Sequence, residues 1–324
     1  MKGDQAKTAL MLAVERGEIG VVKLFLEYAE DKKIDLNVID RLWFTKNTAL
    51  FYAVLRQQDQ ILDLLCQDSR IEINVRDGSS QTPFMAACDL GFPDILQVFF
   101  KYAQSRNIDL NARDQNGMTG FAMACGAGND LAVSMLLKQV ETLGIDPNIT
   151  DNGGKTAFIY ACIKNEAKVV EMLMKNSERL GIDLNHVDQE GMTGLMRACK
   201  EKKNYVVDIF FRVAKFCHID FNCQDTLGRT AYIWAAFKCK KDQEVFEPFH
   251  IYAKKYKIDL KIKDKKGKMG EDYIKQGVLS GQIGHLIRDD QEDWDKAHSK
   301  KLYRTHAKLE WDIDNDEFDP PEFV

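Results

Sequence analysis

The sequence is poor in proline and cysteine and has no long hydrophobic run. Only 6 of its 324 residues are proline and 8 are cysteine, which argues against a collagen-like chain and against a disulfide scaffold. No apolar segment approaches the roughly 18 residues that span a bilayer. Charged residues such as Asp4, Glu15 and Arg16 interrupt the region where a signal peptide would need an apolar stretch. We therefore expect a soluble, cytoplasmic or nuclear protein without a membrane partner.

A basic excess is also missing, since the net charge is −5. A nucleic-acid-binding protein is usually basic, so no nucleic-acid partner is expected. What the chain does contain is 45% hydrophobic and 29% charged residues. That balance supports a packed core and excludes wholesale disorder.

A repeat of 37 residues runs through the chain. A tetrapeptide of the type Ile-Asp-Leu-Asn occurs seven times, and an aspartate follows three residues after each copy. Five successive spacings are 37 residues and the last is 39. A period of this size indicates stacked units that bury each other's apolar faces. The fourth residues of the tetrapeptides are Asn37, Asn74, Asn111, Asn148, Asn185, Asn222 and Lys261.

Each unit also contains a helix-start signal. A threonine recurs about five residues after the aspartate, where its hydroxyl can accept from an amide one turn into a helix. In four units a glycine stands two residues before the threonine and suits a turn with positive φ. Each unit therefore predicts a short helix, a bend, a second amphipathic helix and an extended finger. The threonines are Thr8, Thr48, Thr82, Thr119, Thr156, Thr193 and Thr230.

The chain resembles the ankyrin-repeat family. Residues 117–125, G-M-T-G-F-A-M-A-C, are similar to the family pattern G-x-T-P-L-H-x-A-A, and residues 111–114, N-A-R-D, to its finger N-A-x-D. The resemblance implies an all-α solenoid of stacked helix-turn-helix units with β-hairpin-type finger loops over residues 1–290. Seven units are recognisable, and a degenerate eighth, which starts at Met269, would cap the stack.

Two departures from the family pattern carry expectations. The unit is four residues longer than the usual 33, which predicts a second helix about one turn longer. The family histidine that ties neighbouring fingers by hydrogen bonds is replaced by apolar residues such as Met85 and Ile159. We therefore expect apolar packing to join the repeats in its place.

The cysteines invite a metal or redox interpretation, which we disfavour. Four of them recur every 37 residues, where a buried column of small side chains is the simpler reading. A second cluster (Cys217, His218, Cys223 and Cys239) has no zinc-site spacing. Lys155 and Thr156 mimic the end of a phosphate-binding loop but lack its first glycine. No catalytic residue, metal or cofactor is predicted. The four cysteines are Cys88, Cys125, Cys162 and Cys199.

The resemblance implies a concave partner-binding surface made by the fingers and the first helices. Apolar candidates there are Leu55, Leu90, Met118, Ile163, Met192 and Phe237, next to basic Arg16, Arg56, Lys164 and Lys200. The second finger adds Leu42, Trp43 and Phe44, which either anchor a partner or fold back over neighbouring helix ends.

Charge separates strongly near the C-terminal end of the sequence. Residues 254–268 hold eight lysines against two aspartates, which predicts either a site for an acidic partner or nuclear import factor, or a solvated finger. Residues 291–309 would form one more helix. Residues 310–324 carry seven acidic residues and no basic one. Such an acidic segment with aromatic residues is typical of a flexible recognition motif, and we expect it to fold back and compete with a partner.

Together these features predict a non-catalytic scaffold or adaptor. It would be a monomer that binds a peptide or domain of another protein, with an acidic peptide among the candidates. One alternative is an inhibitor of a transcription factor that resembles the NF-kappa-B inhibitor class. Another is the regulatory ankyrin part of a larger enzyme.

Overall fold

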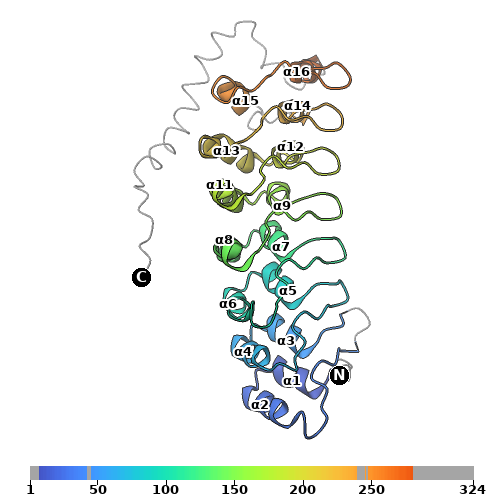
Figure 1. Cartoon of the computed structure of the whole chain (residues 1–324). Helices are drawn as coiled ribbons and strands as arrows, with labels where there is room; N and C mark the ends of the chain where they lie inside the picture. The colour runs from blue at the N-terminus through green and yellow to red at the C-terminus, as the bar shows by residue number, and fades with distance from the viewer. Residues whose placement is uncertain (1–6, 42–44, 239–244, 246, 280–324) are drawn as a thin grey trace.

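The computed structural model describes residues 7–41, 45–238, 245 and 247–279, and it shows a stack of helix pairs. The first helices of the pairs form one column and the second helices another, with the finger loops projecting on the far side of the first helices (Figure 1). Within the described residues there is no β-sheet; the extended pairing is limited to an isolated bridge between Arg113 and Thr119. The expected all-α repeat fold is confirmed.

The first helices have similar lengths, from 7 to 10 residues, while the second helices vary from 6 to 14. The first helices are α1 (Ala9–Glu15), α3 (Ala49–Leu55), α5 (Pro83–Leu90), α7 (Gly120–Ala127), α9 (Ala157–Lys164), α12 (Gly194–Lys200), α14 (Ala231–Lys238) and α16 (Gly270–Leu279). The second helices are α2 (Ile19–Tyr28), α4 (Asp59–Gln67), α6 (Pro93–Tyr102), α8 (Asp130–Leu143), α10 (Ala167–Lys175), α13 (Asn204–Val213) and α15 (Glu247–Tyr252). Two short segments extend the fifth and sixth pairs, α11 (Ser177–Leu180) and the 3-10 helix η2 (Ala214–Phe216).

The first helices begin at the recurring threonines. In six of the seven, the hydroxyl accepts from the amide three residues later; Thr119, for example, accepts from Ala122 at 3.2 Å. This confirms the predicted caps, each worth about 1 kcal/mol. Thr48, which follows the unusual second finger, is the exception: its Oγ1 is buried and finds no hydrogen-bond partner among the described residues.

Each finger is closed by its aspartate. In the fourth repeat, Asp114 Oδ1 accepts from the amides of Asn116 at 2.9 Å and Met118 at 2.8 Å, and the Asp114 amide donates to the Met118 carbonyl at 3.0 Å. Gly117 has φ +81° at the turn between them, as the sequence predicts. The spacing from the recurring aspartate to the threonine, as from Asp114 to Thr119, is therefore set by the closed turn between them.

The core is continuous along the stack. Cys88, Cys125, Cys162 and Cys199 are fully buried, and burial raises the pKa of each thiol. This confirms the predicted buried column. The residues in place of the family histidine are buried as well, and Met85 and Ile159 are fully inaccessible. A thiol that stays protonated inside an apolar core is unreactive.

Apolar packing joins the repeats as expected, but polar contacts join them as well, so the expectation that packing alone replaces the missing hydrogen bonds holds only in part. The finger asparagine that follows one helix pair binds the end of the second helix in the next pair. Asn111 Nδ2 donates to the Gly144 carbonyl at 2.8 Å, and Asn111 Oδ1 accepts from the Asp146 amide at 2.9 Å. The same pair of bonds occurs at six asparagines, which we call the asparagine ladder: Asn37, Asn74, Asn111, Asn148, Asn185 and Asn222.

Main-chain bonds join the finger tips in addition. The Asn152 amide donates to the Asn116 carbonyl at 2.8 Å, and the Lys265 amide donates to the Leu227 carbonyl at 3.0 Å. Equivalent bonds link the other neighbouring fingers from Thr45 onward. Each repeat is thus held to the next by helix packing, by the asparagine ladder and by the finger backbone.

The prediction of a longer second helix holds only in part. Helix α8 runs for 14 residues, but α6 ends at Tyr102 and the chain continues in turns. Those turns close with Asn107 at φ +49° and a bond from the Ile108 amide to the Ala103 carbonyl, 2.9 Å long. The extra residues therefore build a left-handed helix cap. The predicted boundary at residue 290 and the helix in 291–309 lie outside the described residues.

Candidate functional site

The first helices turn one face toward the fingers, and we call this face with the adjoining finger surface the inner surface. The residue four positions after each cap threonine lies here. Tyr52 donates to Asp40 Oδ2 at 2.9 Å, and the Trp234 indole donates to Asp225 Oδ2 at 2.8 Å. Tyr160, Arg197 and Tyr273 bind their finger aspartates in the same way. These bonds fix the angle between helix and finger.

Sequence reasoning did not select these residues as part of the surface. The available signal was the chemistry at this one register position, where tyrosine, tryptophan or arginine stands in five of the eight units. Each can donate one hydrogen bond over the length of its side chain. Ala86 and Met123 occupy the position in the third and fourth repeats and make no such bond among the described contacts.

The apolar candidates at the end of the first helices are exposed or partly exposed, so a partner could contact them. Leu55 is 38% exposed, Leu90 42% and Phe237 39%. Ile163 is half-buried. A partner would therefore find three well-exposed apolar side chains along this surface, which are separated by one or more repeats.

The finger-tip candidates differ from one another. Met118 is half-buried against a small cluster of Met85, Ala112 and Met123. Met192 is fully buried, with Lys200 Nζ 3.7 Å from its sulfur, so this candidate contact residue is not accessible to a partner in this structure. Leu42, Trp43 and Phe44 lie outside the described residues, and their two predicted roles stay predictions.

Part of the basic rim predicted beside these residues is paired at the N-terminal end. Arg56 forms an ion pair with Glu15, which also pairs with Lys7 at 2.6 Å. The hydrogen bond from Arg56, then that from Lys7, holds the pKa of Glu15 below its usual value. Lys7 in turn lies 4.6 Å from the centre of the Tyr52 ring. Two cations thus share one carboxylate at this end of the inner surface.

The sixth repeat places a deeper ion-pair network on the inner surface. Arg197 donates from Nε to the buried Asp188 at 2.6 Å and from Nη2 to Glu190 at 2.8 Å. Lys200 reaches the other oxygen of Glu190 at 3.0 Å. The bond from Arg197, followed by that from Lys200, lowers the pKa of Glu190. The network fixes one finger to its helix and leaves Lys200 partly exposed.

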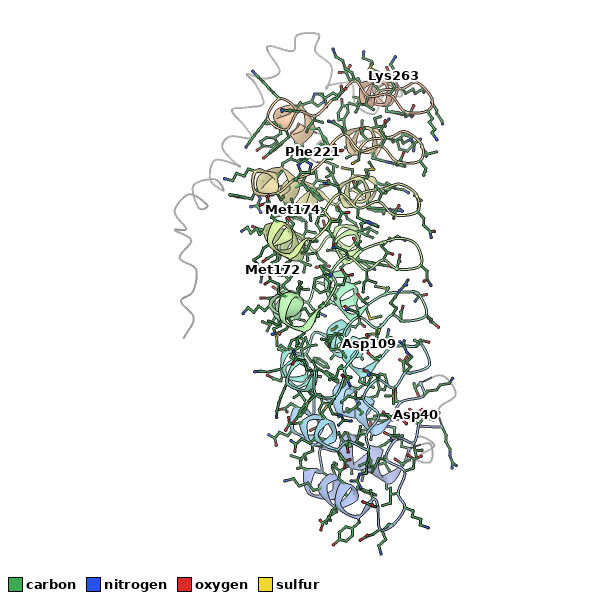
Figure 2. All side chains as sticks on the ribbon, in the orientation of Figure 1. Asp40, Asp109, Met172, Met174, Phe221 and Lys263 are labelled. Atoms are coloured by element: carbon green, nitrogen blue, oxygen red, sulfur yellow. The ribbon has the colours of Figure 1, made fainter. Side chains whose placement is uncertain are left out.

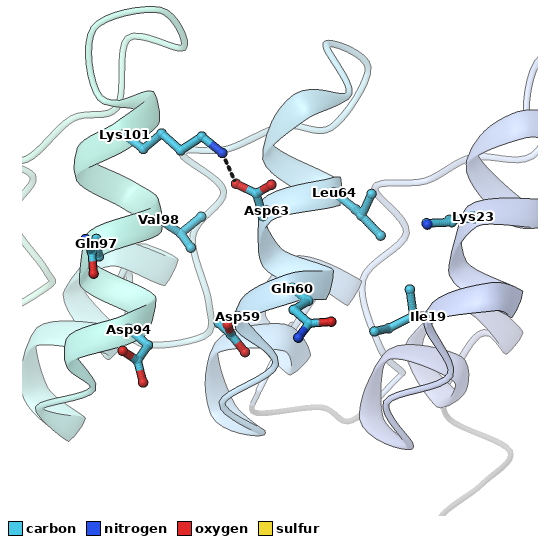
Figure 3. A pocket seen from close by; sticks show the side chains of 10 residues that line it. All are labelled: Ile19, Lys23, Asp59, Gln60, Asp63, Leu64, Asp94, Gln97, Val98 and Lys101. Carbon is cyan, nitrogen blue, oxygen red and sulfur yellow. Dashed lines mark hydrogen bonds and ion pairs between the residues drawn. The ribbon is translucent and has the colours of Figure 1, made fainter.

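Hollows in the described surface lie elsewhere, along the second helices. One of 660 Å³ crosses α2, α4 and α6, where Lys101 pairs with Asp63 at 2.6 Å (Figure 3). Asp59 and Asp94 line it as well, but each stands in the first turn of its helix, where a negative charge is stabilising. Another of 450 Å³ lies between α6 and α8, and one of 720 Å³ lies between the end of α2 with residues 33–37 and the residues Ser69 and Arg70 that follow α4.

The described residues give no indication of a metal or membrane site. No three His, Cys, Asp or Glu side chains in this part of the chain are grouped so that they could hold a metal ion. Cys217 approaches the Val213 carbonyl and Cys223 approaches Asp220, and burial raises their pKa values to about 11 and about 12. None of the described helices has the length and apolar character to cross a bilayer.

Known proteins agree with this architecture. The family model described as "Ankyrin repeats (3 copies)" matches residues 1–77 and 84–187, more than half of the chain. None of the curated proteins matches the chain. Among solved structures, the crystal structure of the ankyrin repeat domain of Bcl-3, described as a unique member of the IkappaB protein family, is similar with a TM-score of 0.63. It is 21% identical, and the alignment covers 75% of this chain and 98% of that one. The chain belongs to the ankyrin-repeat family.

Proposed function

We propose that this chain is a non-catalytic scaffold that binds another protein on its inner surface. The observation that carries the proposal is the exposure of Leu55, Leu90 and Phe237, which are 38–42% accessible on one face of the stack. Helix packing, the asparagine ladder and the finger backbone hold that stack together. Apolar side chains spaced along a pre-ordered surface bind a partner with little loss of conformational entropy. Polar and charged neighbours such as Lys164 supply a rim.

The test compares capture of cellular partners by three forms of the full chain. Leu55→Ser/Leu90→Ser removes two inner-surface contacts, while Leu131→Ser/Tyr205→Ser removes two side chains, 57% and 73% exposed, from the second helices. We expect a protein captured by the wild type to be lost at least tenfold from the first variant and kept by the second, with equal melting temperatures. Equal capture by both variants would place the contact away from the inner surface. Trp43→Ala/Phe44→Ala then tests the second finger in the same assay.

The alternative functions are separated by the identity of the captured partner. A transcription factor whose activity falls on binding supports the inhibitor alternative, and a catalytic polypeptide whose activity changes supports the regulatory one. The likeness to the Bcl-3 domain, at 21% identity, concerns the fold and leaves that choice to the experiment. A monomer in cytoplasm or nucleus is part of the proposal, and sedimentation and imaging of the tagged chain test it.

A further inference from the structure

The C-terminal end of the inner surface carries alternating aromatic and cationic side chains. The Trp234 and Phe237 rings meet edge to face with centroids 5.9 Å apart, and Phe237 meets Tyr273 in the same way at 5.3 Å. Since α14 and α16 pack against each other, these rings form one band across two repeats. We call the following six residues the C-terminal patch: Lys200, Arg229, Trp234, Phe237, Lys268 and Tyr273.

Cations line this band. The Arg229 guanidinium lies 4.6 Å from the Trp234 ring centre and 5.0 Å from that of Phe237. Lys200 approaches Trp234 at 5.1 Å, and Lys268 approaches Tyr273 at 5.4 Å. Arg229 and Trp234 are buried, at 9% and 5% exposed, so the charge that an anion in solvent can reach belongs to the two lysines. A lysine placed against an aromatic face keeps its charge and still attracts an anion.

Nearby acidic groups cancel only part of this charge: Arg229 pairs with Asp264 at 3.8 Å and Lys200 with Glu190 at 3.0 Å, while no ion pair to Lys268 is found among the described residues. Asp225 and Asp264 are buried and accept from finger amides and from Trp234 and Tyr273, while Glu190 is paired with Arg197. Glu271 is exposed, and Asp259 lies at the far end of the last finger. That finger also exposes four lysines and half-buries a fifth; Figure 2 shows Lys263 at this end of the stack. The lysines are Lys261, Lys263, Lys265, Lys266 and Lys268.

The chain itself contains a segment with the complementary chemistry. Residues 310–324 hold seven carboxylates, no basic residue, and the aromatic side chains of Trp311, Phe318 and Phe323. Carboxylates suit the exposed lysines of the last finger, and aromatic rings suit an edge beside Phe237, which is 39% exposed. Charge and ring chemistry therefore match on both sides.

The segment is also within reach. Thirty residues separate Leu279, at the end of α16, from Glu310. Such a connection covers about 45 Å as a helix and at most roughly 100 Å when extended. Helices that pack together, such as α14 and α16, have axes roughly 10 Å apart. A tether of this length gives a local concentration on the order of millimolar, which makes even a weak contact populated.

We propose that residues 310–324 of this chain bind the C-terminal patch and compete there with a protein partner. The proposal deepens the proposed function, on which its competitive aspect rests. The tail shields the patch until a partner with higher affinity displaces it. Binding of the tail to the patch weakens as the salt concentration rises, because the contact is largely between opposite charges.

The test uses a fluorescent synthetic peptide of residues 310–324 and anisotropy titrations with full-length chains. In the first chain all seven acids of 310–324 are changed to Asn or Gln, so that its own tail no longer competes. We expect saturable binding to this chain and at least tenfold weaker binding to the wild type, whose tail occupies the site. A peptide with Trp311, Phe318 and Phe323 changed to serine should bind at least tenfold more weakly.

Two further variants in the tail-neutralised chain locate the site. Lys200→Glu/Lys268→Glu/Phe237→Ala should weaken peptide binding at least tenfold, and Lys23→Glu/Lys138→Glu/Leu131→Ala, on the second helices, should not. Thermal melting confirms that both variants are folded. No saturable binding to the tail-neutralised chain, equal binding by the wild type, or equal loss in both variants would overturn the proposal. The scaffold function is judged separately by Leu55→Ser/Leu90→Ser, which leaves the patch intact.

Discussion

Asn111 holds Gly144, the cap residue of α8, and the Asp146 amide through the two ends of its side-chain amide. Its Nδ2 donates to the carbonyl of Gly144, which has φ +68°, and its Oδ1 accepts from the amide of Asp146 two residues later. A carbonyl at a helix end lacks an intrahelical partner, and this contact supplies one. The asparagine ladder thus does between helix ends and fingers what the family histidine does between fingers.

Removing one asparagine of the ladder should lower the stability of the stack. Asn111→Ala loses two hydrogen bonds and leaves the Gly144 carbonyl to solvent, and because the site is exposed we expect a loss of about 1–2 kcal/mol in the free energy of unfolding. Urea unfolding measures it. The matched control is Asn116→Ala, because the Asn116 side chain makes only a 3.5 Å contact within its own finger. Equal effects of the two changes would contradict a stabilising ladder.

A second prediction concerns a finger glycine. Gly191 has φ +73°, and a Cβ placed on it would lie 2.9 Å from the Thr226 amide nitrogen of the next finger. Gly191→Ala is therefore strained both by its conformation and by its neighbour, and we expect it to cost about 1–3 kcal/mol. Gly20→Ala is the control, since Gly20 lies in α2 with nothing within 4 Å of its added Cβ. It should be neutral or stabilising by up to about 1 kcal/mol, because alanine favours a helix. Differential scanning calorimetry of both variants measures these two changes in stability.

Local contacts were predictable from the sequence, and contacts between repeats were not. A threonine cap involves an amide three residues away, so the motif itself reports the bond, as at Thr119 and Ala122. The partner of Asn111 lies 33 residues on, at a carbonyl whose direction depends on how one repeat rotates against the next. The recurrence of asparagine every 37 residues was visible, but its target was not.

The same distinction explains the candidate surface. Met118 and Met192 occupy one register position, immediately before the cap threonine, and only Met192 is fully buried. Lys200 covers Met192, whereas the equivalent residue beside Met118 is Gly126, which has no side chain to do so. Exposure at this position is thus decided by a residue eight positions later. Pattern alone assigned both methionines to the finger tip.

The Arg197 network should be far more sensitive than a surface ion pair. Arg197→Met keeps the volume but leaves the buried Asp188 carboxylate without its cation. Breaking such a buried pair costs about 3–5 kcal/mol. Arg179→Met breaks the Arg179–Glu141 pair, in which both side chains are more than half exposed, and should cost less than about 1 kcal/mol. Similar midpoints in urea for the two variants would show that Asp188 is satisfied by finger amides alone.

The buried thiols predict a loss of stability at alkaline pH. Burial raises the pKa of Cys66 to about 12 and that of the four column cysteines further, while an unfolded thiol titrates near pH 8.5. Above that pH the unfolded chain loses protons that the folded chain keeps. Stability therefore falls as pH rises, by up to about 1.4 kcal/mol per pH unit for each thiol.

Cys125→Ala isolates one thiol of this effect. Urea unfolding between pH 8 and 9.5, under reducing conditions, should give a slope of unfolding free energy against pH that is less steep by up to about 1.4 kcal/mol per unit than in the wild type. Val54→Ala serves as the control, because Val54 holds the same buried column position in the second repeat and has no ionisable group. It should lower stability by about 1 kcal/mol or more at every pH and leave the slope unchanged. A slope unaltered by Cys125→Ala would mean that this thiol ionises as easily in the folded chain as in the unfolded one.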